Sequence, residues 1–118
     1  MIRTGLIALL CACPIASAAE TFEQITSRET FLDTVAGKEL SRFLVSLEVH
    51  PDGRITGRGF GRDIIGSWTW QGDYFCRNLY WDNSLLDARN CQAVEKRGSE
   101  LRFISDRGTG DSATLSLR

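Results

Sequence analysis

Hydrophobic positions first follow a helical period. Between residues 26 and 37, apolar side chains recur at helical spacing, at Phe31, Leu32 and Val35. Thr26 and Glu29 have the spacing of a capping box, in which each side chain satisfies a backbone N–H of the first turn. Gly37 then supplies a natural stop. We therefore predict one short N-terminal helix whose apolar stripe packs against a larger element.

From residue 43 onward, apolar and polar side chains alternate, which is typical of strands. Turns rich in glycine, proline and aspartate separate the alternating segments, which span residues 43–49, 54–60, 64–71, 74–82, 89–96, 101–105 and 113–117. No helix-length segment lies between them, which excludes a parallel sheet. The predicted fold is mainly β, an antiparallel meander of about seven strands curled into a half-barrel or a small barrel.

The first residues have the three parts of a secretory signal peptide. Arg3 supplies the charge, residues 6–15 form an apolar run, and residues 16–19 are small. The apolar run is too short to span a bilayer as a helix, which needs about 20 residues. We expect cleavage near Ala19 and a periplasmic or secreted protein, with residues 20–118 forming a single small domain. The alternative is a lipobox-like reading of residues 10–13, which would leave a lipid anchor on Cys13.

Removal of the leader leaves two cysteines, Cys76 and Cys91. In an oxidising compartment they most simply form one disulfide, worth about 3 kcal/mol in the chain-entropy model. Opposed cysteines on neighbouring antiparallel strands place a two-residue hairpin loop at Asn83-Ser84. A bulge at residues 85–86 would shift the outer end by one residue. A zinc site and a reactive thiol are weaker alternatives, since His50 is the single histidine.

The charge balance and the aromatic content indicate which classes of protein this chain can belong to. The chain has 14 basic and 15 acidic side chains and a net charge of −1, which argues against a nucleic-acid partner. The 3 Trp, 2 Tyr and 6 Phe residues are sufficient for a packed core. No second long apolar stretch follows the leader, so we expect no membrane span.

Arginines recur at strand positions that a curled sheet would bring together: Arg54, Arg58, Arg62, Arg77 and Arg102. Guanidinium groups beside an aromatic ring suit a carboxylate or phosphate ligand. The candidate ligand contacts are therefore Arg58, Arg62, Arg77 and Trp81. The interpretation that we favour for most of these arginines is an exposed face on which they pair with nearby acids, Asp63, Asp73 and Glu95.

Other conspicuous segments have mainly structural interpretations. The aromatic residues between 68 and 81 are expected to form the core, with Trp81 as the candidate for a pocket wall. The glycines of residues 57–61 are followed by another strand, so they indicate a bend in the sheet and no dinucleotide loop. Residues 106–111 read as a turn, with a calcium or anion cradle as the alternative. No nucleophile, metal or cofactor motif is recognisable.

Several motifs resemble a family of small secreted bacterial proteins. These are an AGKEL start at residues 36–40, a GxWxWxxxxFC block at 66–76, a second cysteine, and SDRGTGDSA at 105–113. Some members are labelled dihydrodipicolinate reductase, which would imply a nicotinamide cofactor. This chain lacks the glycine loop after the first strand and the histidine pair that such reductases need. The resemblance also implies a lipocalin-like barrel.

We expect a non-catalytic exported module that binds a small anionic or apolar ligand at a barrel mouth. One alternative is an inhibitor or accessory protein that binds another envelope protein. A third possible function is that of an enzyme with the reductase activity that the family label names. We expect no cofactor and no metal.

Overall fold

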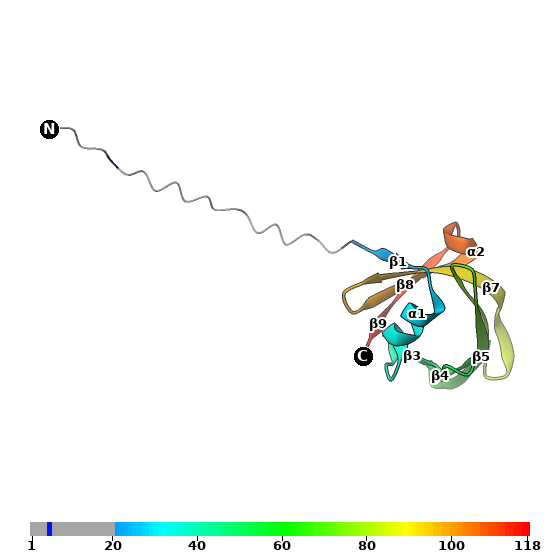
Figure 1. The fold of residues 1–118 in the computed structure, drawn as a ribbon. Coiled ribbons are helices and arrows are strands. Elements are labelled where there is room, and N and C mark those ends of the chain that lie inside the picture. Colours follow the sequence, from blue (N-terminus) through cyan, green and yellow to red (C-terminus); the bar gives the residue numbers. More distant parts are fainter. Residues whose placement is uncertain (1–4, 6–20) are drawn as a thin grey trace.

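The computed structural model describes residue 5 and residues 21–118. The predicted leader, its cleavage site near Ala19 and the alternative lipid anchor at Cys13 lie outside the described residues. The described elements, in chain order (Figure 1), are β1 (Glu23–Ile25), α1 (Arg28–Val35), β2 (Leu40–Arg42), β3 (Val45–Val49), β4 (Arg54–Gly59), β5 (Arg62–Gln71), β6 (Tyr74–Trp81), β7 (Ser84–Arg97), β8 (Glu100–Ile104), α2 (Ser105–Gly108) and β9 (Ser112–Leu117).

Strands β2 to β9 form a closed antiparallel barrel. Hydrogen-bonded neighbours follow the order β7-β6-β5-β4-β3-β2-β9-β8, and β8 pairs back onto β7. The long strand β7 closes the ring, because residues 84–92 pair with β6 and residues 93–97 pair with β8. β1 pairs with residues 94–96 of β7. It therefore lies on the same edge of β7 as β6, past the point where β6 ends.

The predicted mainly β, antiparallel architecture is confirmed, and the sheet is a closed barrel rather than a half-barrel. The barrel has eight strands instead of about seven, since Leu40–Arg42 forms the additional strand β2. β1 and β2 have 3 residues each, which is too short for an alternating pattern to be recognised. The described chain has a second short helix, α2, in addition to the predicted N-terminal helix, so the prediction of one helix is wrong.

Cys76 and Cys91 form a disulfide between directly opposed positions of β6 and β7. The predicted register holds next to the disulfide, where Phe75 faces Gln92 and Arg77 faces Asn90. Two register shifts follow before the hairpin, so that Trp81 faces Ser84. The hairpin loop is therefore residues 82–83 rather than Asn83-Ser84. The sequence predicts one bulge, at residues 85–86. The structure has two register shifts, each of which adds one residue to β7, and they cause the difference.

Two glycines allow neighbouring strands to approach closely. A Cβ atom on Gly57 would collide with the carbonyl oxygen of Ser46 in β3. A Cβ atom on Gly66 would collide with the carbonyl oxygen of Asn78 in β6. The glycine-rich strands thus let the sheet coil into a narrow barrel.

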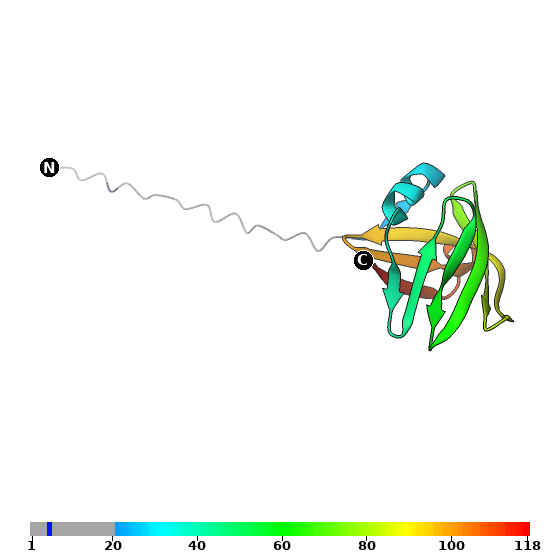
Figure 2. The ribbon, with the colours of Figure 1, turned by 90° about the horizontal axis from the view of Figure 1, so that it is seen from below.

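Helix α1 covers one end of the barrel, and the hairpins β2–β3, β4–β5 and β6–β7 lie at the opposite end (Figure 2). The helix begins after Ser27, whose hydroxyl accepts a hydrogen bond from Thr30 N at 3.2 Å. The predicted cap was Thr26, one residue earlier. Phe31 is fully buried and its ring contacts Trp68, with 5.7 Å between the ring centroids. We call the end of the barrel that α1 covers the closed end, and the end with the three hairpins the open end.

Candidate functional site

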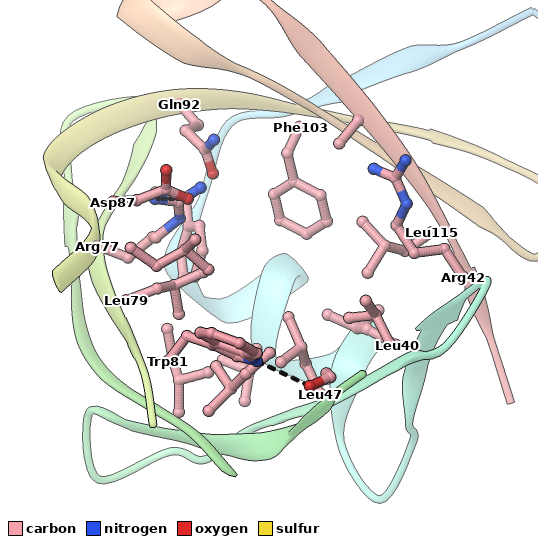
Figure 3. Close-up of a pocket in the computed structure, with 18 of the residues that line it drawn as sticks. Leu40, Arg42, Leu47, Arg77, Leu79, Trp81, Asp87, Gln92, Phe103 and Leu115 are labelled. Atoms are coloured by element: carbon pink, nitrogen blue, oxygen red, sulfur yellow. Dashed lines mark hydrogen bonds and ion pairs between the residues drawn. The ribbon is translucent and has the colours of Figure 1, made fainter. Parts of the chain in front are cut away.

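The half of the barrel nearer the open end is hollow. Its cavity has a volume of about 440 Å³. Most of the lining side chains are apolar and come from strands around the ring, among them Leu40, Leu47, Ile55, Leu79, Phe103 and Leu115. In Figure 3 the labelled side chains surround an open space, and α1 lies behind it. An eight-stranded barrel is wide enough to hold one small ligand.

Phe75 forms the boundary between this cavity and the filled core. Its ring lines the cavity and also contacts Phe31 of α1, with 4.9 Å between the ring centroids. The rings of Trp68 and Trp70 pack around Phe31 from β5. The predicted aromatic core is therefore confirmed for these two tryptophans, and it fills the closed end of the barrel.

Trp81 belongs to the cavity wall, as predicted for that residue. Its indole Nε1 donates a hydrogen bond to the carbonyl oxygen of Gly59 in β4 at 2.8 Å. This bond satisfies the polar atom of the indole and leaves the apolar ring as cavity surface. Tyr80 precedes Trp81 in β6 and is exposed, so its predicted place in the aromatic core is wrong, because strand alternation turns it to the outer face.

Arg77 is the one candidate arginine of the sequence that lies in the cavity wall. Its side chain is 13% exposed, and Nη1 lies 3.3 Å from Oδ2 of Asp87. Burial lowers the pKa of the Arg77 guanidinium, and the negative charge and hydrogen bonding of Asp87 oppose this shift. The pair therefore brings a nearly neutral polar group to a mostly apolar wall.

A bulge in β7 places Asp87 on the inner face of the barrel. Continuation of the register at the disulfide would put Asp87 opposite Tyr80, which is on the outer face. The first register shift instead puts Asp87 opposite Leu79, an inner residue. Bulges often redirect a side chain in this way next to functional sites.

Gln92 is the buried polar residue of the same wall. Its Nε2 donates to Oγ of Ser105 at 3.3 Å, at the point where β8 ends. The side-chain oxygen points toward the open space in Figure 3. This oxygen can therefore accept a hydrogen bond from a ligand.

Arg42 is a cavity residue that sequence reasoning missed. It ends β2 and extends along the cavity from that strand toward the Phe103 side (Figure 3). Within residues 21–118, no acidic group lies close enough for an ion pair with Arg42, whereas Arg54, Arg58, Arg62, Arg77, Arg97 and Arg102 each have one. Its three-residue strand gives no periodic signal by which sequence analysis could have placed it.

Arg58 and Arg62 do not lie with Arg77 in the cavity. Arg58 points outward from β4 and pairs with Asp63 at 2.9 Å. Arg62 begins β5 at the open end and pairs with Asp82 at 2.9 Å. The candidate cluster of arginines considered in the sequence analysis is therefore not formed. The interpretation of exposed arginines paired with nearby acids describes Arg58. Arg102 pairs with Glu95 at 2.7 Å, as that interpretation expects, but both side chains are half-buried.

Residues 105–111 form a tight turn with the short helix α2. Asp106 and Arg107 both have left-handed backbone angles, with φ values of 54° and 55°. Asn90 in β7 holds the turn, since its side chain donates to Asp106 Oδ1 at 2.7 Å and accepts from Asp106 N at 2.9 Å. The segment predicted as a turn therefore contains the short helix α2 and connects the antiparallel strands β8 and β9.

Apolar side chains lie exposed on the hairpins of the open end. They are Phe43, Leu44, Phe60, Leu85 and Leu86, and we call them the apolar rim. Phe43 is 82% exposed. Leu44 and Phe60 have left-handed φ values of 57° and 50°, an uncommon conformation for bulky residues. The Phe60 N–H donates to the Leu44 carbonyl oxygen at 2.9 Å and so joins two of the hairpins.

No helix in the described part of the chain is long and apolar enough to cross a membrane. Residues 21–118 contain no cluster of three or more His, Cys, Asp or Glu side chains that could hold a metal ion. Comparison of the chain with family models, with curated proteins and with solved structures finds no match. The barrel and its cavity are therefore the features of the molecule that point to a function.

Proposed function

We propose that this protein is an exported, lipocalin-like carrier or sensor that binds one small, largely apolar ligand inside its barrel. The observation that carries the proposal is the cavity of about 440 Å³, which lies within the usual size range of ligand pockets. Export is part of the proposal, supported by the leader-like first residues and by the Cys76–Cys91 disulfide.

The apolar walls favour a ligand over an empty barrel. Side chains such as Leu47, Leu79 and Leu115 face the space, where they lack the contacts that a packed core would supply. Protein interiors are normally close-packed, and voids larger than a water molecule are few. A ligand with an apolar body restores these contacts and removes its own surface from water.

The position of α1 also supports this function. The helix and the aromatic cluster around Phe31 fill the closed end, so a ligand enters between the hairpins of the open end. The hydrogen bond of Trp81 to Gly59 and the disulfide between β6 and β7 hold the walls in place. A preformed cavity lowers the ordering cost of binding.

The test is titration of the purified protein with N-phenyl-1-naphthylamine, a neutral apolar dye that fluoresces in apolar surroundings. We expect saturable binding of one dye per chain. Leu79→Trp fills the cavity and should abolish the binding, whereas Ile65→Trp adds the same side chain on the outer face of β5 and should not. Failure of the folded wild-type protein to bind the dye would overturn the proposal.

The apolar rim supports a second candidate function, that of an accessory protein or inhibitor that binds another envelope protein. Exposed aromatic and aliphatic side chains in one patch often mark a protein interface. A stoichiometric complex should then survive Leu79→Trp and disappear with Phe43→Ser combined with Leu85→Ser. The opposite pattern would assign the rim to ligand entry.

A further inference from the structure

We infer that the ligand is an amphiphile with a monoanionic head, of which a carboxylate is the simplest, and that Arg42 binds this head. The inference rests on the proposed function, because it concerns the same cavity. It follows from the charges of the lining residues, from the place of Arg42 in the barrel and from the path that the cavity leaves for the ligand.

The cavity has one net positive charge. Its charged lining residues are Arg42, Arg77 and Asp87. Asp87 neutralises Arg77 at 3.3 Å, so the charge of Arg42 remains. A monoanion balances this charge, whereas a dianion would place an additional negative charge in the cavity that also contains Asp87. The charge balance in the cavity favours a carboxylate over a phosphate.

The placement of Arg42 suits a head group at the water boundary. Arg42 is an exposed residue that also lines the cavity, and its neighbour Phe43 belongs to the apolar rim. A planar guanidinium can bind a carboxylate with two parallel hydrogen bonds. Because the head stays next to water, the ligand need not bury an isolated charge.

The apolar part of the ligand then extends toward the closed end. Between Arg42 and Phe75 the walls are formed by apolar residues such as Leu40, Val49 and Ile55. Phe75 contacts Phe31 of α1 and so ends the cavity. The side-chain oxygen of Gln92 offers one further contact to a ligand that has a hydroxyl group along its chain.

The experiment compares three probes that share one alkyl chain and differ in their heads: dodecanoate, dodecanol and dodecyl phosphate. Each displaces N-phenyl-1-naphthylamine from the purified wild-type protein, from Arg42→Gln and from Arg58→Gln. Arg58 is the matched control, because it is an arginine on the outer face at the same end of the barrel. The pH is chosen so that the phosphate is a dianion.

We expect dodecanoate to displace the dye from wild type at about one tenth of the dodecanol concentration, as a charge-assisted hydrogen bond predicts. Arg42→Gln should remove this preference and leave the affinity for dodecanol unchanged. Arg58→Gln should retain the preference.

The contrary outcomes are distinguishable. Equal binding of dodecanoate and dodecanol by wild type would overturn the inference and leave the proposed function intact. Stronger binding of dodecyl phosphate would overturn the monoanionic head. A preference that persists in Arg42→Gln would remove Arg42 from the site. Absence of dye binding would reject the proposed function itself.

Discussion

The side chains of Arg77 and Asp87 form an ion pair inside the barrel, on the two strands that the disulfide joins, with 3.3 Å between Nη1 and Oδ2. The arginine is largely buried, and the carboxylate side chain is 47% exposed. The aspartate reaches this position through a bulge in β7, so the local irregularity of one strand supplies the counter-charge for its neighbour.

Asp87→Asn is expected to lower the free energy of unfolding by about 2 kcal/mol. The substitution leaves the Arg77 charge without a counter-ion, and the exposure of the carboxylate keeps the loss below that of a fully buried pair. Urea denaturation measures the change. The double variant Arg77→Met with Asp87→Leu removes both charges and should recover most of the lost stability. An unchanged midpoint for Asp87→Asn would show that water already solvates the guanidinium.

Reduction of the Cys76–Cys91 disulfide is expected to lower the free energy of unfolding by about 3 kcal/mol, because it releases the loop between residues 15 apart in the sequence. Denaturation curves with and without dithiothreitol give the difference. The double variant Cys76→Ala with Cys91→Ala is the control, and dithiothreitol should not change its denaturation curve. If reduction left the wild-type curve in place, the bond would make no contribution to stability.

Gly57→Ala is expected to destabilise the protein by about 3 kcal/mol, since the added Cβ collides with the backbone of β3. Gly72→Ala is the matched control. Gly72 has a φ of 59° and open space around its Cα, so only the conformational cost of about 1 kcal/mol applies. Comparison of the two unfolding midpoints tests whether the close approach of β3 and β4 shapes the barrel. Equal losses would argue that it does not.

Most of the barrel could be predicted from the sequence because its strands alternate and its turns contain glycine or aspartate. The disulfide fixed the register of β6 and β7 near Cys76, where the prediction is confirmed. The register failed toward the hairpin because a bulge inserts residues without changing the composition of the strand. The strand β2 was missed because three residues cannot show a period.

The candidate site was harder to predict than the fold. Trp81 and Arg77, which were proposed from the hairpin position of Trp81 and from the expected curling of the sheet, both lie in the cavity wall. Arg58 was placed in the same group, but it alternates to the outer face of β4. Arg42 could be identified only from the structure, because the closure of the barrel brings β2 into the cavity wall.

Phe31→Ala is expected to cost between about 3 and 5 kcal/mol, because it removes a fully buried ring from the cluster of Trp68, Trp70 and Phe75. The same substitution at Phe43, which is 82% exposed, should change the free energy of unfolding by less than about 0.5 kcal/mol. Urea denaturation of both variants compares an identical chemical change at the two ends of the barrel. A similar loss for both would mean that the rim is packed in solution, whereas a small loss for Phe31→Ala would mean that α1 does not close the barrel.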